Sequence, residues 1–485
     1  MAAAEKQPVN VTFAGPLNGA LSGALTWIDQ RFPLMSLWTD HLAGYYAPKN
    51  FNFWYYFGSL AMLVLVLQIV TGIFLVMHYK PDANLAFASV EYIMRDVQGG
   101  WLIRYMHSTG ASAFFIVVYL HMFRGLMYGS YRKPRELIWI FGMLIYLCLM
   151  AEAFFGYLLP WGQMSYWGAQ VIVNLFSALP LIGPDLSLWI RGDYVVSDAT
   201  LNRFFSFHVI AIPLVLLGLV AAHIMALHEV GSNNPDGVEI KKTKDPRTGH
   251  PLDGIPFHPY YTVKDTLGVV VFAIVFCAIL FFLPEMGGYF LEYNNFIPAD
   301  PLKTPPHIAP VWYFTPYYSI LRATTDNFLW VLAAALVGYV ALIWRTMQDM
   351  RIRVIAAVVA FVTIMLMVGP EFTINLGFSK LKIPFDAKVW GVAAMGVSTL
   401  IFFALPWLDQ SPVKSIRYKG PLCRAALGIF VVVFLVLGYY GTQPVTTEGT
   451  IISQVCTLIY FSFFLLMPWY TRMDTTKPEP SRVTW

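Results

Sequence analysis

The sequence predicts an all-α polytopic membrane protein, with a four-helix bundle followed by further C-terminal transmembrane helices and about ten spans in total. Of its 485 residues, 57% are hydrophobic and only 12% are charged, whereas a soluble domain carries about 25% charged residues. A bilayer core needs about 20 apolar residues per helix, and apolar runs of this kind recur along the whole chain. Four histidines inside the early runs mark the bundle as the part that carries chemistry.

The predicted spans are separated by polar links, and several are bounded by clustered basic residues. The tenth ends near the C-terminal tail, and the seventh is the shortest. The expected ranges are 57–79, 103–128, 137–159, 204–227, 267–283, 328–344, 354–368, 389–408, 425–440 and 451–469.

Lysine and arginine are concentrated in the links that follow the even-numbered spans and in the tail, at residues 129–136, 228–266, 345–353, 409–420 and 470–485. The link after the ninth span contains Glu448 and neither lysine nor arginine. Because short cytoplasmic loops collect Lys and Arg, all even-numbered ends are expected on one side. Both termini are therefore expected in the cytoplasm.

The segments between the spans divide the chain further. Residues 17–40 alternate apolar and polar positions and predict a helix lying on the membrane surface. Residues 165–190 and 284–323 are apolar but broken by prolines and glycines, which predicts short helices sheltering a shared site on the non-cytoplasmic side. The expected organisation is a surface segment (1–50), a four-helix bundle (51–230), a loop, fifth span and outer-site region (231–324), an inserted helical hairpin (325–387) and a C-terminal three-helix domain (388–485).

Four intramembrane histidines form two spaced pairs. His107 and His121 lie fourteen positions apart on the second span, and His208 and His223 lie fifteen positions apart on the fourth. At about 1.5 Å rise per residue, each pair is separated by roughly 21 Å along its helix. Fourteen positions make nearly four turns, whereas fifteen add roughly 100° of rotation, which helix tilt or a kink at Pro213 has to absorb.

The second and fourth spans run in the same direction, so His107 and His208 share one depth and His121 and His223 share another. A lone intramembrane histidine is more often a hydrogen-bonded structural residue. Two depth-matched pairs are instead what two bis-histidine haems need for electron transfer across a bilayer. The sequence therefore predicts these four residues as metal ligands of two non-covalent b-type haems.

Glycines on the other two early spans support this interpretation. Gly58 and Gly72 on the first span are fourteen positions apart, and so are Gly142 and Gly156 on the third. A missing side chain lets a helix approach a flat ligand. Ordinary small-residue helix packing is the alternative, but it favours a spacing of four. These four glycines are expected to line the cofactor sites.

Two arginines lie one turn from the histidines of the second span. Arg104 precedes His107 by three positions and Arg124 follows His121 by three. Each is placed to pair with haem propionates, although Arg124 also fits a positively charged anchor at the cytoplasmic end of the span.

Long segments of the chain resemble cytochrome b of the cytochrome bc complexes, and the resemblance covers nearly the whole length. The segments that carry it are GWLIRYMHSTGAS, HMFRGLMYGSYRKPRE, GYLLPWGQMSYWGAQVI, RFFSFHVIAIP, HEVGSNNPDG, IPFHPYYTVKD, IPADPLKTPPHI and GTQPV.

The resemblance implies a quinol–cytochrome c oxidoreductase subunit of the bacterial type, working by a Q cycle that contributes to the proton gradient. Ubiquinol is oxidised at the outer face, and one electron crosses through the two haems to reduce ubiquinone near the cytoplasm. It also implies a homodimeric complex with a Rieske iron–sulfur protein and a c-type cytochrome subunit. The pair His107 and His208 corresponds to the low-potential haem, and the pair His121 and His223 to the high-potential haem.

Quinone-site residues are also implied by the resemblance. The inner site corresponds to His228, Ser232, Lys264 and Asp265, a set suited to delivering protons to a reduced quinone. The outer site corresponds to Gly168, Pro310, Trp312, Tyr313 and Tyr318.

The sequence departs from the family at the outer site, where the usual Pro-Glu-Trp-Tyr motif has Val311 in place of glutamate. Valine cannot accept a quinol proton. The hypothesis is that Glu152, the one acid inside the third span, replaces that glutamate as a catalytic residue. Glu285, Glu292 and water chains through Tyr313 are the alternatives.

Two further departures concern spacing and length. The spacing of fifteen between His208 and His223 matches the chloroplast counterpart rather than mitochondrial relatives, although the C-terminal spans are fused here. The family has eight spans, so the sixth and seventh are interpreted as an insertion between SILRA and DAKVWGV.

Two other classes remain as alternatives: a dihaem membrane anchor of a dehydrogenase, which usually needs only about four or five spans, and a proton-coupled transporter, which inverted repeats would favour. The small net charge of +4 gives no sign of a nucleic-acid partner. The four cysteines lie singly in apolar runs and form no CxxC or CxxCH motif, so iron–sulfur ligation and covalent haem are not expected.

Overall fold

The computed structural model describes residues 18–33, 44–375, 377 and 380–484. Within these residues, ten helices or continuous helical runs are long and apolar enough to cross a membrane, which confirms the ten predicted spans, although several begin earlier than hydropathy indicates. Their bounds are Phe53–Val76, Gly100–Tyr128, Glu136–Leu158, Asp198–Val230, Phe257–Phe282, Asp326–Thr346, Met350–Val368, Ala387–Leu408, Pro421–Thr442 and Thr447–Leu465.

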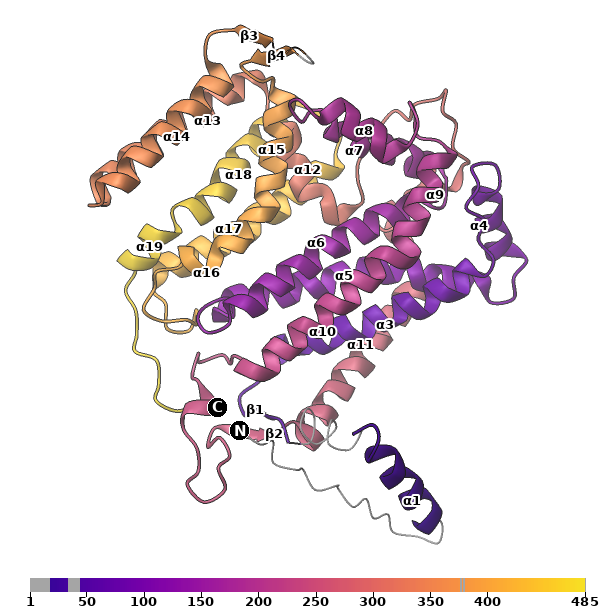
Figure 1. Ribbon diagram of the computed structural model, residues 1–485, viewed down its shortest axis with the longest axis vertical. Coiled ribbons are helices and arrows are strands. Elements are labelled where there is room, and N and C mark those ends of the chain that lie inside the picture. The colour runs from indigo at the N-terminus through magenta and orange to yellow at the C-terminus, as the bar shows by residue number, and fades with distance from the viewer. Residues whose placement is uncertain (1–17, 34–43, 376, 378–379, 485) are drawn as a thin grey trace.

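The first four spans form two helix pairs that run side by side (Figure 1). Helix α3 (Tyr56–Val76), which follows the short η2 (Phe53–Tyr55), packs along α5 (Gly100–Tyr128). Helix α6 (Glu136–Leu158) packs along α10 (Ile212–Val230). We call the pair α3 and α5 the first wall and the pair α6 and α10 the second wall. The predicted ligands lie on α5 and on the α10 run, so each wall contributes one histidine helix.

A π-helical turn, η3 (Phe207–Ala211), joins α9 (Asp198–Ser206) to α10. Helix tilt or a kink at Pro213 is the outcome expected from the spacing of His208 and His223. The structure instead absorbs the extra residue in this turn, whose hydrogen bonds span one residue more than α-helical ones. Pro213 has no amide hydrogen to donate to the preceding turn, which favours the wider turn at this place.

Helix α11 (Thr262–Phe282) follows η5 (Phe257–Tyr261) and packs against the first wall, touching both α3 and α5. The last three spans gather around α12 (Thr315–Ala323), a short buried helix that contacts α15, α17 and α18. The bounds of this C-terminal group are α15 (Ala387–Leu400), η9 (Ile401–Ala404), α16 (Leu405–Leu408), α17 (Pro421–Thr442), α18 (Thr447–Leu465) and α19 (Met467–Met473).

Helices α13 (Asp326–Thr346) and α14 (Met350–Val368) pack on each other at the edge of the molecule (Figure 1). The antiparallel strands β3 (Phe372–Asn375) and β4 (Lys380–Ile383) follow them, and the sequence pattern does not predict this strand pair. The Trp469 indole donates to the Thr346 hydroxyl at 2.8 Å. The Phe385 amide donates to the Leu366 carbonyl at 2.8 Å. The described part of the predicted 325–387 hairpin thus attaches to the C-terminal group at its edge.

Short helices cover the end of the bundle that lies away from the C-terminal tail, and we call this end the opposite face. As predicted for residues 165–190, two of them are separated at Pro180 and Gly183. The Asn295 side-chain oxygen accepts from the Ser165 amide at 2.8 Å, which ties η7 to α7. The elements of this face are α4 (Ala86–Arg95), α7 (Gln163–Phe176), α8 (Gly183–Arg191), η6 (Met286–Gly288), η7 (Tyr293–Phe296) and η8 (Trp312–Phe314).

The other end of the bundle, which we call the C-terminal face, holds the tail and the links after the second, fourth and eighth spans. Strands β1 (Tyr46–Pro48) and β2 (Gly254–Pro256) pair here, near η4 (Ile240–Lys242). The helix α1 (Asn18–Asp29) confirms a helix within the predicted surface segment 17–40, of which residues 17 and 34–40 lie outside the described residues.

Ion pairs connect the links of the C-terminal face, which places those three even-numbered ends and the tail on one side, as the charge pattern predicts. Glu239 accepts from Arg135 at 2.6 Å and from Lys414 at 2.5 Å. Buried Asp409 pairs with Lys419 at 2.6 Å. The other pairs are Arg132 with Asp409, Arg417 with Asp236, Lys49 with Asp253 and Arg482 with Asp253. Three links and the tail are therefore held together electrostatically.

Replacing Glu239 by Gln should destabilise the fold at neutral pH. Burial alone raises the pKa of Glu239, but Arg135 and Lys414 outweigh it and hold the pKa at about 2, against an ordinary value of 4.5. The variant leaves Arg135 buried without a carboxylate, which should cost about 3–5 kcal/mol at pH 7. A lower thermal unfolding temperature of the purified protein is the expected result.

The stabilisation by Glu239 should depend on pH. A carboxyl group whose pKa is depressed in the fold stabilises fully above its unfolded pKa, and the contribution is lost as the pH falls through the folded pKa. The difference between wild type and Glu239→Gln should therefore shrink from pH 4.5 toward pH 2. Glu371→Gln, on an exposed residue, is the control. An unfolding temperature of Glu239→Gln equal to that of this control at pH 7 would contradict the prediction.

Candidate functional site

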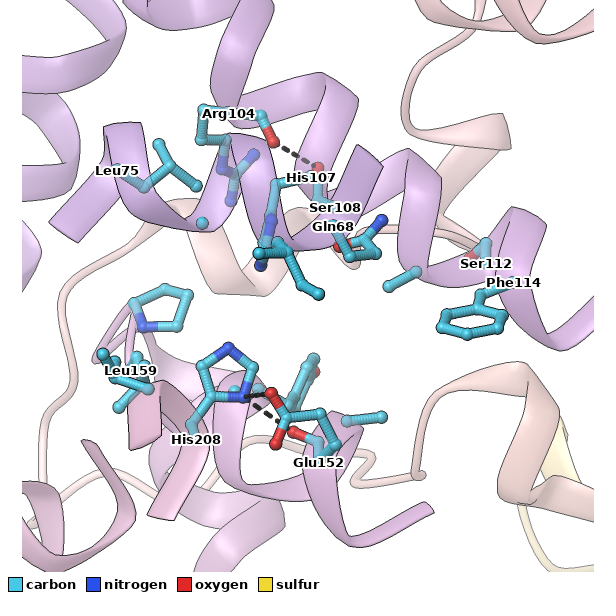
Figure 2. Close-up of a pocket in the computed structure, with 18 of the residues that line it drawn as sticks. Gln68, Leu75, Arg104, His107, Ser108, Ser112, Phe114, Glu152, Leu159 and His208 are labelled. Atoms are coloured by element: carbon cyan, nitrogen blue, oxygen red, sulfur yellow. Dashed lines mark hydrogen bonds and ion pairs between the residues drawn. The ribbon is translucent and has the colours of Figure 1, made fainter. Parts of the chain in front are cut away.

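The outer histidine pair lies between the two walls. His107 on α5 and His208 in η3 face each other across a cavity (Figure 2), with ring centroids 6.1 Å apart and planes at 87°. The Nδ1 atom of His107 lies 2.9 Å from the Thr71 hydroxyl oxygen, and that of His208 lies 2.9 Å from the Glu152 carbonyl oxygen. With Nδ1 of both rings engaged, Nε2 is the nitrogen left to bind a metal.

The inner pair repeats this arrangement deeper in the bundle. The ring centroids of His121 and His223 are 6.5 Å apart, with planes at 66°. Two imidazole nitrogens that each lie about 2.0 Å from one metal place their ring centroids about 6 Å apart. Both pairs match that separation. The Nδ1 atoms of His121 and His223 are buried without a hydrogen-bond partner in the protein. The residues present therefore fit the two predicted bis-histidine haem sites.

Each of the four predicted glycines lies against one histidine of its own wall. A Cβ atom built at these positions would meet a histidine ring at 3.2 Å for Gly58 (His121), 3.3 Å for Gly72 (His107) and 3.4 Å for Gly142 (His223), and would overlap the ring of His208 at Gly156. A Cβ atom at Gly156 would displace the ring of His208, whereas at Gly58 and Gly72 the ring would have to move only slightly and at Gly142 the contact would be just tolerable. The glycines thus leave room for the histidine rings. Their spacing predicts instead that they leave room for the haem itself.

Both predicted arginines are half-buried, and each has one buried donor atom without a hydrogen-bond partner in the protein. The atoms without a hydrogen-bond partner are Nη1 of Arg104 and Nε of Arg124. Arg104 lines the outer cavity, and the guanidinium of Arg124 lies 5.0 Å from the ring centroid of Tyr55. A buried guanidinium with a free donor needs an anion. The propionates of a haem fit both positions.

The outer cavity continues beyond the histidine pair toward the opposite face. Its volume is about 310 Å³, and its lining is mostly apolar. One end is formed by Arg104, His107 and His208, and the other by Val311 and Tyr313. A single space therefore connects the predicted haem site with the predicted quinol site, so a ligand at one end lies close to a ligand at the other.

The structure brings some of the predicted outer-site residues to this cavity and leaves others beside it. Tyr313 lines the cavity and stacks on Phe115, with ring centroids 3.9 Å apart. A Cβ atom at Gly168 would lie 3.5 Å from the ring of Tyr157, another lining residue. The remaining three, Pro310, Trp312 and Tyr318, are not part of the lining. Trp312 donates to the hydroxyl of Ser112, which is, whereas Tyr318 lies under Arg322.

Glu152 lines the same cavity but has a partner that the sequence does not predict. Its carboxylate Oε1 lies 3.0 Å from Nδ1 of His208 (Figure 2), while Oε2 is buried without a partner. The hypothesis that Glu152 accepts the quinol proton stays a prediction. The geometry adds a second role, since a carboxylate hydrogen-bonded to a ligating imidazole makes that imidazole a stronger donor to the metal.

The two other candidate acids pair with tyrosines. The Tyr157 hydroxyl donates to Oε2 of Glu292 at 2.7 Å, and the Tyr105 hydroxyl donates to Oε1 of Glu285 at 2.9 Å. Tyr157 lines the outer cavity, whereas Tyr105 lies outside its lining. Sequence reasoning missed Tyr157, because neither its spacing nor its neighbours reveal which acid it meets.

The predicted inner quinone residues lie on the C-terminal face, in two parts. Ser232 is 2.8 Å from the Tyr45 hydroxyl, and the ring of His228 stacks on Tyr45 with centroids 4.6 Å apart. Burial raises the pKa of Tyr45, which keeps this hydroxyl protonated. Lys264 and Asp265 lie together on the first turn of α11. Tyr45, which sequence reasoning missed, joins His228 to Ser232.

Profiles of two known families match the chain. The cytochrome b/b6/petB family covers residues 42–231, and the C-terminal cytochrome b/b6/petD family covers residues 298–380 and 369–461. The first match spans both walls and all four histidines. The second covers the outer-site segment and most of the C-terminal group.

Individual relatives agree over nearly the full length. The chain is 58% identical to cytochrome b of Allochromatium vinosum, covering 95% of this chain and 98% of that one, and 42% identical to cytochrome b of Rhodospirillum rubrum, covering 95% and 96%. A solved chain from a hyperthermophilic respiratory Complex III superposes with a TM-score of 0.74 at 34% identity, covering 93% of this chain and 99% of that one. The chain therefore belongs to the cytochrome b family, whose members bind haem b in a membrane.

Proposed function

We propose that this chain is the cytochrome b subunit of a quinol–cytochrome c reductase and carries electrons from an outer quinol site to an inner quinone site. The observation that carries the proposal is the two pairs of facing histidine rings between the two walls. His107 and His121 are fourteen positions apart on α5, which makes about 21 Å along the helix. Two sites at that separation divide the membrane into steps short enough for electron transfer.

Residues of this chain position every participant. When bound, the two haems supply one-electron chemistry, which side chains alone cannot. The four histidines hold them, the glycines fix the histidines, and Arg104 and Arg124 offer donors to anionic groups. Ubiquinol fits the end of the outer cavity beside Tyr157 and Tyr313, and this apolar end excludes water.

The inner site is proposed at the C-terminal face. Ubiquinone reduced there has to take up protons, and His228, Ser232, Lys264 and Asp265 are the groups available to deliver them. Tyr45, bound to Ser232 and stacked on His228, fixes the orientation of the first two. Proton uptake on this face and release on the opposite face together contribute to a proton gradient.

The proposed partners follow from what the reaction needs beyond this chain. Quinol oxidation at the outer site has to divide two electrons, and only one can go to the haems. A Rieske iron–sulfur protein is proposed to take the other electron and a c-type cytochrome subunit to carry it on. The relative from the hyperthermophile belongs to a respiratory Complex III, which supports a multi-subunit assembly, and we propose a homodimer of it.

The proposed location is the bacterial inner membrane with the C-terminal face in the cytoplasm. Basic residues of that face, among them Arg135, Lys414 and Lys419, support this orientation because cytoplasmic loops collect positive charge. The opposite face, which includes α7 and α8, then lies in the periplasm.

Replacing His223 by Leu should remove the inner haem and leave the outer one. The purified complex should then contain one b haem for each chain in place of two, measured by pyridine haemochrome assay against protein. A redox titration of the visible spectrum should lose the component of higher potential and keep the other. His78→Leu, at an exposed histidine just beyond the end of α3, should keep both components.

Two outcomes would contradict this proposal. If the wild-type complex holds one haem or none, the histidine pairs serve another purpose, and a proton-coupled transporter becomes the favoured function. If His223→Leu retains both components at unchanged potentials, the inner ligand has been assigned wrongly.

Glu152→Gln should raise the midpoint potential of the outer haem. The carboxylate beside His208 favours the oxidised metal, and a neutral amide does not. The expected rise is on the order of 50–100 mV, the Coulombic scale of a unit charge at a partly buried site. The inner component serves as the internal control in the same titration. An unchanged outer potential together with slowed quinol oxidation would favour the other hypothesis, in which Glu152 accepts the quinol proton.

A further inference from the structure

The apolar end of the outer cavity poses a chemical problem. Quinol oxidation releases two protons, yet Val311, which is 4% exposed, has no group that accepts one. Burial raises the pKa of Tyr313 far above its ordinary value, so its hydroxyl keeps its own proton. A proton acceptor therefore has to come from an acid that reaches this end of the cavity.

Three glutamates lie near enough to be compared. Glu152 is in the lining, but its carboxylate already contacts His208 at 3.0 Å and lies within the α6 span. Glu285 bonds Tyr105, which is not part of the lining. Glu292 bonds Tyr157, which is part of it. Only the last of these has both a link to the cavity and a position on the opposite face.

Glu292 lies at the start of η7, in the link between α11 and η8, and is partly buried. The neighbouring Tyr293 is 63% exposed, so the segment reaches the surface. The carboxylate of Glu292 therefore lies between the cavity, through Tyr157, and the water outside. A proton that arrives there has a short way out.

The charge environment suits a group that takes and releases a proton. Burial raises the pKa of Glu292 to about 7, although the hydrogen bond from Tyr157 partly lowers it. Tyr157 from α6 and Tyr313 from η8 are the titratable groups that interact with it among the described residues. Ser165 of α7 and Asn295 of η7, which pair beside it, are neutral.

We propose that Tyr157 and Glu292 form the proton exit of the outer quinol site, with Tyr157 contacting the quinol and Glu292 acting through it. The quinol hydroxyl gives its proton to the Tyr157 oxygen as the proton of Tyr157 moves to Oε2 of Glu292. When bound, the haem held by His107 and His208 would accept one electron and the proposed iron–sulfur partner the other, and the second proton would leave with that partner. Glu292 then releases its proton to water and regains its charge.

This inference rests on the proposed function, and it is tested in the complete complex with a short-chain ubiquinol as donor. Glu292→Gln should lower the rate of quinol-dependent cytochrome c reduction by about 10²-fold, the scale of general acid–base catalysis. Tyr157→Phe should lower it similarly. Glu292→Asp should recover part of the rate, because it keeps the carboxylate.

The pH profile separates proton transfer from a structural role. A proton acceptor works when ionised, so kcat/KM of wild type should rise with pH through about 7 and then level. Glu292→Gln should lose this inflection while its dithionite-reduced spectrum and haem potentials stay those of wild type. Glu285→Gln, the matched glutamate–tyrosine pair outside the cavity lining, should keep rate and profile.

The outcomes are distinct. A wild-type rate and inflection in Glu292→Gln overturns the proposal, and so does loss of the inflection in Glu152→Gln alone. A wild-type complex that holds both haems but never reduces them with ubiquinol overturns the proposed function instead. Should Glu292→Gln lose its haems, Tyr157→Phe decides, since a wild-type profile in that variant excludes the exit through Tyr157.

Discussion

The structure depends on the placing of four imidazoles inside an apolar bundle. A polar ring at membrane depth has to be satisfied, and here the rings are held between two helix walls rather than within one. In each wall the histidine rings pack against glycines of the neighbouring helix, so each ring lies directly on the helix backbone. A side chain at Gly156 would displace His208, and with it one end of the outer cavity.

In the proposed function, the continuity of the outer cavity places the quinol beside the outer haem site. The space beside His107 and His208 runs without a break to Val311 and Tyr313. Short helices of the opposite face close it, and Asn295 ties two of them together through Ser165. Substrate and first electron acceptor thus share one apolar compartment, and the polar groups that reach it are few enough to have separate tasks. Glu152 contacts His208, whereas Glu292 is linked to the cavity through the hydroxyl of Tyr157.

The amino-acid pattern predicts much of this arrangement and fails in specific places. Ten spans, the four histidines and the four glycines follow from hydropathy and spacing, because those depend on helix period and membrane thickness alone. The pairing of Tyr157 with Glu292, and of Tyr45 with Ser232, joins residues 135 and 187 positions apart. No local period carries such information. The strands β3 and β4 are missed because a short exposed hairpin buries too little to leave a pattern.

The π-turn at Phe207–Ala211 changes what a residue count means. Gly142 and Gly156 are fourteen positions apart on α6, and they meet His223 and His208, which are fifteen positions apart on the neighbouring run. Fourteen residues of one helix and fifteen of the other therefore span the same distance along the bundle. A separation counted along a helix measures distance only when every turn has the same hydrogen-bond period. One wide turn allows a chain to gain a residue without moving a ligand, so relatives with either spacing between these histidines can hold their metals in the same place.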